Sequence, residues 1–64
     1  MFGENLKRVR EEKGWTQQKL ADESGVPVST LRGYEQGQRS PTWEAVVSIA
    51  EALGVSLDVF REGR

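Results

Sequence analysis

Adjacent carboxylates are the side chains in this sequence whose types and spacing come nearest to a catalytic pair. Glu11 stands beside Glu12, and Asp22 stands beside Glu23. Neighbouring side chains on a helix point in different directions, so neither pair would converge on one substrate atom. The absence of Cys and His removes thiolate nucleophiles, zinc-thiolate sites and the usual acid–base group near neutral pH. We therefore expect no catalytic residue, no metal site and no cofactor, and we expect a protein that binds rather than an enzyme.

Charge is the second property that limits the function. Nine Lys and Arg residues oppose ten Asp and Glu residues, which gives a net charge of −1. Binding to nucleic acid would therefore depend on where the charges lie. Residues 7–39 carry seven basic and five acidic side chains, whereas residues 40–60 carry three acidic side chains and no basic one. The middle of the chain is mildly cationic, although a charge run usually marks only a solvated face.

The length of 64 residues predicts a single small domain, residues 1–64, that buries about 60% of its unfolded surface. No apolar run approaches the roughly 18 residues of a membrane span. The N-terminus has neither the basic start nor the apolar stretch of a secretory signal. We expect a cytoplasmic protein, at the nucleoid if it binds DNA, with no membrane partner.

Apolar periodicity predicts three helices in the first half of the chain. Phe2, Leu6 and Val9 recur at i, i+4 and i+7, which indicates an amphipathic helix over about 3–13 that ends at Gly14. Thr16 can cap a second helix over about 16–24. Gly25 and Pro27 interrupt that pattern, and a third helix begins at Pro27 or Val28 and ends at Gly37.

The second half predicts one long core helix and a short last segment. Ser40 reads as the cap and Pro41 as the first helical residue, where its missing N–H costs nothing. The apolar face of this helix runs to Leu53, and Gly54 ends it. Ser56 can cap a last segment whose apolar contacts come from residues 57–60.

The second and third helices have the spacing of a bihelical unit over about 16–36. Two helices that cross steeply over a short turn need a small residue where they approach and a turn residue that tolerates positive φ, and Ala21 and Gly25 meet these needs. Leu20, Val26 and Leu31 can lock the crossing angle by packing, together with Tyr34.

With these residues the sequence resembles the phage repressor and Cro-like (XRE-type) helix-turn-helix family. The resemblance covers nearly the whole chain and includes polar positions as well as the apolar frame. The matching segments are Leu6–Gly14, Thr16–Gln17, Leu20–Ala21, Gly25–Val26, Leu31, Tyr34–Gly37, Ser40–Pro41 and Ile49–Val55. It implies an all-α fold, a compact five-helix domain whose third helix, about 28–36, enters the DNA major groove while the second lies over the backbone.

The resemblance also implies phosphate contacts at both ends of the helix-turn-helix. Gln17 would meet a phosphate at the start of the second helix, although a solvated first-turn glutamine is the alternative. For Thr16, a helix cap and a phosphate contact are equally good interpretations. Arg39 would contact a phosphate after the third helix, with Gln36 and Thr42 as weaker neighbours.

Base-reading residues would lie on the outer side of the third helix, which is the least family-like stretch. Arg32 can donate to guanine O6 and N7 or reach a phosphate, and Ser29 can hydrogen-bond several base edges. Val28 can touch a thymine methyl, or it can be a core residue at the helix entrance. Gly33 weakens a helix by about 1 kcal/mol relative to Ala. Either that cost is tolerated, or the missing side chain lets the helix approach the bases.

Arg10 and Glu35 match an ion pair between the first and third helices of several relatives, and we interpret this pair as structural. Two positions depart from the family pattern. Lys19 stands where relatives often have Glu, so the reciprocal capping box with Thr16 is lost. Pro27 replaces the usual Ser cap of the reading helix.

The sequence thus favours a transcriptional regulator that binds double-stranded DNA in a sequence-specific manner. Of the two kinds of regulator, we expect a repressor. Such a protein would act as a homodimer on an inverted-repeat operator with half-sites about one helical turn apart. An antitoxin-like or other protein-interaction module built on the same fold is the alternative, supported by the acidic balance and the unusual face between Val28 and Gly33.

Overall fold

The computed structural model of the chain describes residues 2–60, which form a helical bundle with no strand in that range. Four α-helices follow one another: α1 (Phe2–Glu12), α2 (Gln17–Ser24), α3 (Val28–Glu35) and α4 (Trp43–Leu53). A 3-10 helix, η1 (Leu57–Phe60), follows them. The all-α prediction is confirmed, but the fifth helix is a single 3-10 turn. The described part therefore has four α-helices, not five.

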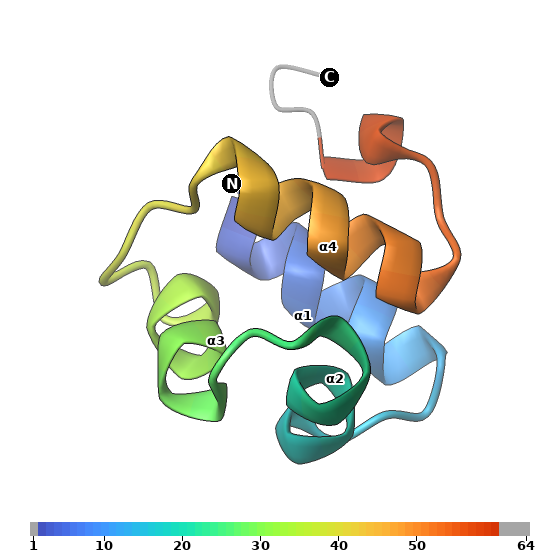
Figure 1. Ribbon diagram of the computed structural model, residues 1–64, viewed down its shortest axis with the longest axis horizontal. Helices are drawn as coiled ribbons and strands as arrows, with labels where there is room; N and C mark the ends of the chain where they lie inside the picture. Colours follow the sequence, from blue (N-terminus) through green and yellow to red (C-terminus); the bar gives the residue numbers. More distant parts are fainter. Residues whose placement is uncertain (1, 61–64) are drawn as a thin grey trace.

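The helices enclose a core to which every element contributes. α1 packs on α3, α2 packs on both α3 and α4, and η1 packs on α1 and α4 (Figure 1). The fully buried side chains are Leu6, Leu20, Leu31, Ile49 and Leu53. Because Leu20 and Leu31 belong to this core, the relative orientation of α2 and α3 is set by packing in the centre of the domain.

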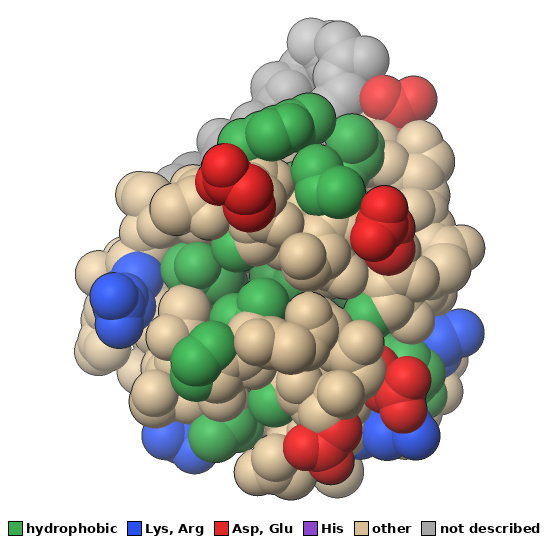
Figure 2. Space-filling view, in the orientation of Figure 1, with side chains coloured by type: hydrophobic (Ala, Val, Ile, Leu, Met, Phe, Trp, Pro, Cys, Tyr) green, Lys and Arg blue, Asp and Glu red, His purple; other side chains and the backbone are tan. Residues whose placement is uncertain are grey.

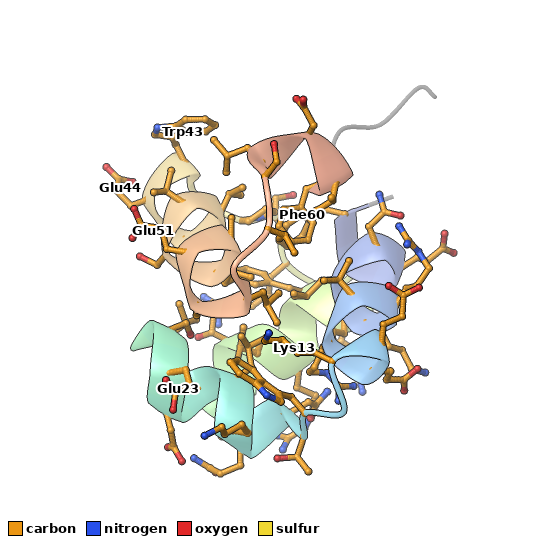
Figure 3. All side chains as sticks on the ribbon, turned by 90° about the vertical axis from the view of Figure 1, so that its right-hand side faces the viewer. Lys13, Glu23, Trp43, Glu44, Glu51 and Phe60 are labelled. Carbon is orange, nitrogen blue, oxygen red and sulfur yellow. The ribbon has the colours of Figure 1, made fainter. Side chains whose placement is uncertain are left out.

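An aromatic cluster joins the start of α1 to the rest of the bundle. The ring of Phe2 meets Tyr34 of α3 edge-on at 5.8 Å between centroids and Phe60 of η1 at 5.3 Å. Both separations lie in the range that aromatic pairs prefer. Phe60 points from η1 toward α1 (Figure 3). Because Phe60 is buried, η1 covers this end of the hydrophobic core.

The start of α4 differs from the sequence prediction. The N-cap is Thr42, whose hydroxyl oxygen accepts a hydrogen bond from the Ala45 N–H at 3.1 Å. Ser40 and Pro41 precede the helix and lie in the loop. Two hydroxyl residues stand before the same apolar run, and the helix uses the later one, so Pro41 does not occupy the first helical position. Its side chain lines an apolar groove with Phe2 instead.

No helix among the described residues is both long and apolar enough to cross a membrane. Within the same residues, no group of three or more acidic, His or Cys side chains could hold a metal ion.

Candidate nucleic-acid interface

The unit formed by α2, its turn and α3 is built by local signals in the sequence. The Thr16 hydroxyl accepts from the Lys19 N–H at 3.0 Å and begins α2. Gly25 ends α2 with φ 79° and ψ 5°, and its N–H donates to the Ala21 carbonyl at 2.9 Å. This left-handed conformation is costly for any residue with a Cβ. Pro27 precedes α3 in an extended conformation with no side-chain cap.

Of the four predicted base-reading residues on α3, two are exposed to solvent. Ser29 and Arg32 are exposed, and Arg32 forms no ion pair among residues 2–60. Val28 is half-buried against the core, which is the alternative that the sequence left open for it. Gly33 is buried, because the side chain of Arg39 covers it on the outer side of the helix, so it is not open to solvent in this structure.

A polar network behind α3 ties three helices together. The Arg10 guanidinium donates to Glu35 through Nε to Oε2 at 2.7 Å and through Nη2 to Oε1 at 3.1 Å. Its Nη1 donates to the Trp15 carbonyl at 2.7 Å. The Gln17 amide also donates to Glu35 Oε1, at 3.0 Å. One carboxylate of α3 thus accepts from α1 and from the first residue of α2.

This network is largely withdrawn from water. The Arg10 and Glu35 side chains are 10% and 4% exposed. No buried side-chain polar atom of the described residues lacks a hydrogen-bond partner. The hydrogen bonds that Arg10 donates to the Glu35 carboxylate raise the pKa of the guanidinium, while burial acts in the opposite direction. The two charges neutralise each other inside the domain, so Glu35 adds little negative potential to the surface of α3.

The predicted phosphate-contact residues lie in two places. Thr16 and Gln17 begin α2, whereas Gln36, Arg39 and Thr42 follow α3. The bond between Gln17 and Glu35 brings the start of α2 beside the end of α3. The hydroxyls of Thr16 and Thr42 both cap helices. Arg39 is exposed and, like Arg32, forms no ion pair within the described chain.

The sequence interpretation missed a cationic cluster at the turn between α1 and α2. The ammonium groups of Lys13 and Lys19 lie 5.3 and 5.5 Å from the ring centroid of Trp15, within the range of cation–π attraction. Lys19 also pairs with Glu23 at 3.0 Å. An aromatic residue with lysines two positions before it and four after it was the available signal. The cluster adjoins the capped start of α2.

Two short helices joined by a three-residue turn, with a polar outer side on the second, define a bihelical binding unit. A helix-turn-helix family model matches residues 6–60, and the chain belongs to the helix-turn-helix family.

Individual relatives agree with this assignment. The chain is 41% identical over 63 residues to the HTH-type transcriptional regulator YqaE of Bacillus subtilis, a match covering 98% of this chain and 54% of that protein. It is 40% identical over 55 residues to the cryptic phage CTXphi transcriptional repressor RstR of Vibrio cholerae, covering 86% and 49%. The chain therefore spans about half the length of these two regulators.

A solved structure supports the fold. The restriction-modification controller protein C.AhdI of Aeromonas hydrophila superposes with a TM-score of 0.91 at 33% sequence identity, covering 94% of this chain and 91% of that one. The resemblance to the repressor and Cro-like family is thereby confirmed for nearly the whole described chain.

Proposed function

We propose that the protein binds double-stranded DNA in a sequence-specific manner as a transcriptional regulator, and that it acts by binding rather than by catalysis. The observation that carries the proposal is the exposed side of α3, where Ser29 and Arg32 stand free of ion pairs on a helix fixed by core packing. An α-helix fits the major groove, and an arginine can recognise guanine through two parallel hydrogen bonds.

Phosphate contacts would hold α3 in register on the duplex. We assign them to the five residues predicted from the sequence, which are Thr16, Gln17, Gln36, Arg39 and Thr42. Gln17 has a second amide N–H beyond the one given to Glu35, so it can serve the network and a phosphate together. If about five phosphates are neutralised, log K falls against log salt with a slope near −4.5. Because one relative is named as a transcriptional repressor, we propose that the regulator represses transcription. Such a protein would act on DNA at the nucleoid, within the cytoplasm.

The experiment is a selection of preferred duplexes from a random pool, followed by affinity measurements. We expect the wild-type chain to enrich one motif. Arg32→Ala should lower affinity for that motif by about 5- to 150-fold, the equivalent of 1–3 kcal/mol, and should leave affinity for random duplex nearly unchanged. Arg8→Ala is the matched control, because Arg8 is an exposed arginine of α1 that pairs with Glu12 at 3.7 Å.

Two results would contradict this proposal in different ways. No enrichment by the wild-type chain would reject sequence-specific recognition. An equal loss of affinity on selected and random duplexes in Arg32→Ala would reassign that residue to a phosphate contact.

The side of the domain formed by α4 and η1 favours a second binding surface. A shallow groove of about 550 Å³ is lined by Phe2, Pro41, Trp43, Val46, Leu57, Asp58 and Phe60. Trp43 is 67% exposed. Hydrophobic side chains gather over α4 and η1 with acidic side chains among them (Figure 2). In Figure 3, Trp43, Glu44 and Glu51 project from the outer side of α4.

A second copy of the chain is the occupant that we propose for this groove. The groove belongs to α4, η1 and the start of α1, so pairing through it leaves the outer side of α3 open on both copies. A two-fold dimer would then place two copies of α3 on an inverted repeat. Tryptophan is the residue type most enriched among side chains that dominate interface energy.

Sedimentation equilibrium tests the dimer. We expect Trp43→Ala to weaken self-association at least about tenfold, in line with a hot-spot loss of 1.4 kcal/mol or more, while helix content is unchanged. Because Glu44 and Glu51 are exposed and project from the outer side of α4 (Figure 3), added salt should screen their repulsion between copies and strengthen association. A wild-type chain that stays monomeric at millimolar concentration would reject the dimer and favour the alternative, a protein-interaction module with another partner at the groove.

A further inference from the structure

The loop after α3 folds back on the helix that it leaves. Gly37 has φ 77°, the left-handed conformation that reverses the chain. The Gly33 carbonyl then accepts from two loop residues, from the Gln38 N–H at 2.9 Å and from the Arg39 N–H at 3.3 Å. The backbone of Arg39 is therefore tied to Gly33 in the second turn of α3, although Arg39 itself stands outside the helix.

The aliphatic part of Arg39 lies directly over Gly33. A Cβ added to Gly33 would stand 2.7 Å from Cδ of Arg39, 2.9 Å from Cγ and 3.6 Å from Cβ. The distances to Cδ and Cγ are too short for a methyl group, so the stem of Arg39 occupies the volume that a larger residue at position 33 would need. Gly33 is buried for this reason, whereas Ser29, one turn earlier in the same helix, is exposed.

We propose that Gly33 is a positioning residue for Arg39. Because Gly33 has no side chain, the aliphatic stem of Arg39 packs directly on α3 at this position, which we call the Gly33 seat. The guanidinium is thereby ordered at the edge of the helix before any ligand binds. The ligand would be a phosphodiester oxygen of duplex DNA, which rests on the proposed function. An arginine that is already ordered loses less side-chain freedom when it binds an anion, and its affinity is higher for that reason.

Gly33→Ala, Arg39→Ala and the double variant separate this role from an ordinary packing role. We expect Gly33→Ala to weaken binding to duplex DNA about three- to tenfold, the range expected when one long side chain must be ordered on binding. In the Arg39→Ala background the same change should alter affinity less than about twofold, because the effect of Gly33 passes through Arg39. The melting temperature of Gly33→Ala should equal or exceed that of the wild type, because Ala is the better helix former.

Two results of this cycle would overturn the proposal. One is an unchanged affinity in Gly33→Ala. The other is an equal loss of affinity in the wild-type and Arg39→Ala backgrounds, which would place the effect in α3 itself.

A measurement without DNA tests the seat alone. The heteronuclear NOE of the Arg39 side-chain Nε–Hε group should indicate an ordered group in the wild type and a mobile one in Gly33→Ala, with exposed Arg32 as the reference for a mobile arginine. An Arg39 signal as mobile as that of Arg32 in the wild type would reject the seat. An ordered Arg39 in a chain that binds no DNA would support the seat and overturn the proposed function together with the phosphate contact.

Discussion

Arg10→Met is expected to lower the free energy of unfolding by about 3 kcal/mol, because it leaves the Glu35 carboxylate buried without its main partner. The carboxylate is 4% exposed and accepts two of its three side-chain hydrogen bonds from Arg10. Met conserves much of the packing of the arginine stem, so the loss comes from the polar groups. Urea denaturation monitored by circular dichroism measures it.

A double-mutant cycle isolates the interaction between the two residues. Glu35→Gln keeps the shape of the side chain and removes its charge. We expect the two single variants and the double variant to give a coupling energy of about 1–3 kcal/mol. The Trp15 carbonyl, which also accepts from Arg10, is unaffected by the Glu35 change and therefore cancels in the cycle.

The matched control is the pair formed by Lys19 and Glu23, which are 3.0 Å apart and similar in distance to Arg10 and Glu35. These side chains are 50% and 47% exposed, so the corresponding cycle should give a coupling energy of about 0.5 kcal/mol or less. The contact of Lys19 with the Trp15 ring cancels in that cycle. A coupling near zero for Arg10 and Glu35 would mean that the pair contributes no more than an exposed one. The three-helix network would then have no structural role.

Short-range patterns were sufficient to predict most of the helices. The i, i+4, i+7 spacing of Phe2, Leu6 and Val9 located α1 because each apolar side chain must face one core. Gly25 located the turn because positive φ has a local cost. The bihelical unit follows from the same two signals.

The features that the sequence did not predict depend on contacts between distant segments. Ser40 and Thr42 are both residue types that cap helices, and the sequence alone did not show that α4 begins after Thr42. Helical periodicity places Gly33 on the outer side, and only the returning loop with Arg39 covers it. Gln17 was interpreted as a phosphate contact or as a solvated residue, whereas its amide donates to Glu35, 18 residues further along the chain.

Gly3→Ala is expected to destabilise the domain by about 2 kcal/mol, although Ala is the better helix former by about 1 kcal/mol. Gly3 lies against the backbone of the last two residues of α3. An added Cβ would overlap the Tyr34 carbonyl oxygen, and it would stand 3.1 Å from the Glu35 carbonyl oxygen and 3.2 Å from the Glu35 carbonyl carbon. These are backbone atoms of α3 and cannot rotate away, so the two helices must separate.

The separation would disturb two further contacts between the same helices, the edge-on packing of Phe2 on Tyr34 and the bonds from Arg10 to Glu35. In a domain of this size, 2 kcal/mol corresponds to a fall in melting temperature of about 8–16 °C. Thermal unfolding measures it, with Gly33→Ala as the matched control: the same change, also within a helix, meets only the movable stem of Arg39. If Gly3→Ala melted at or above the wild-type temperature, the first turn of α1 would have to be able to leave α3 without loss, and this close contact would not contribute to stability.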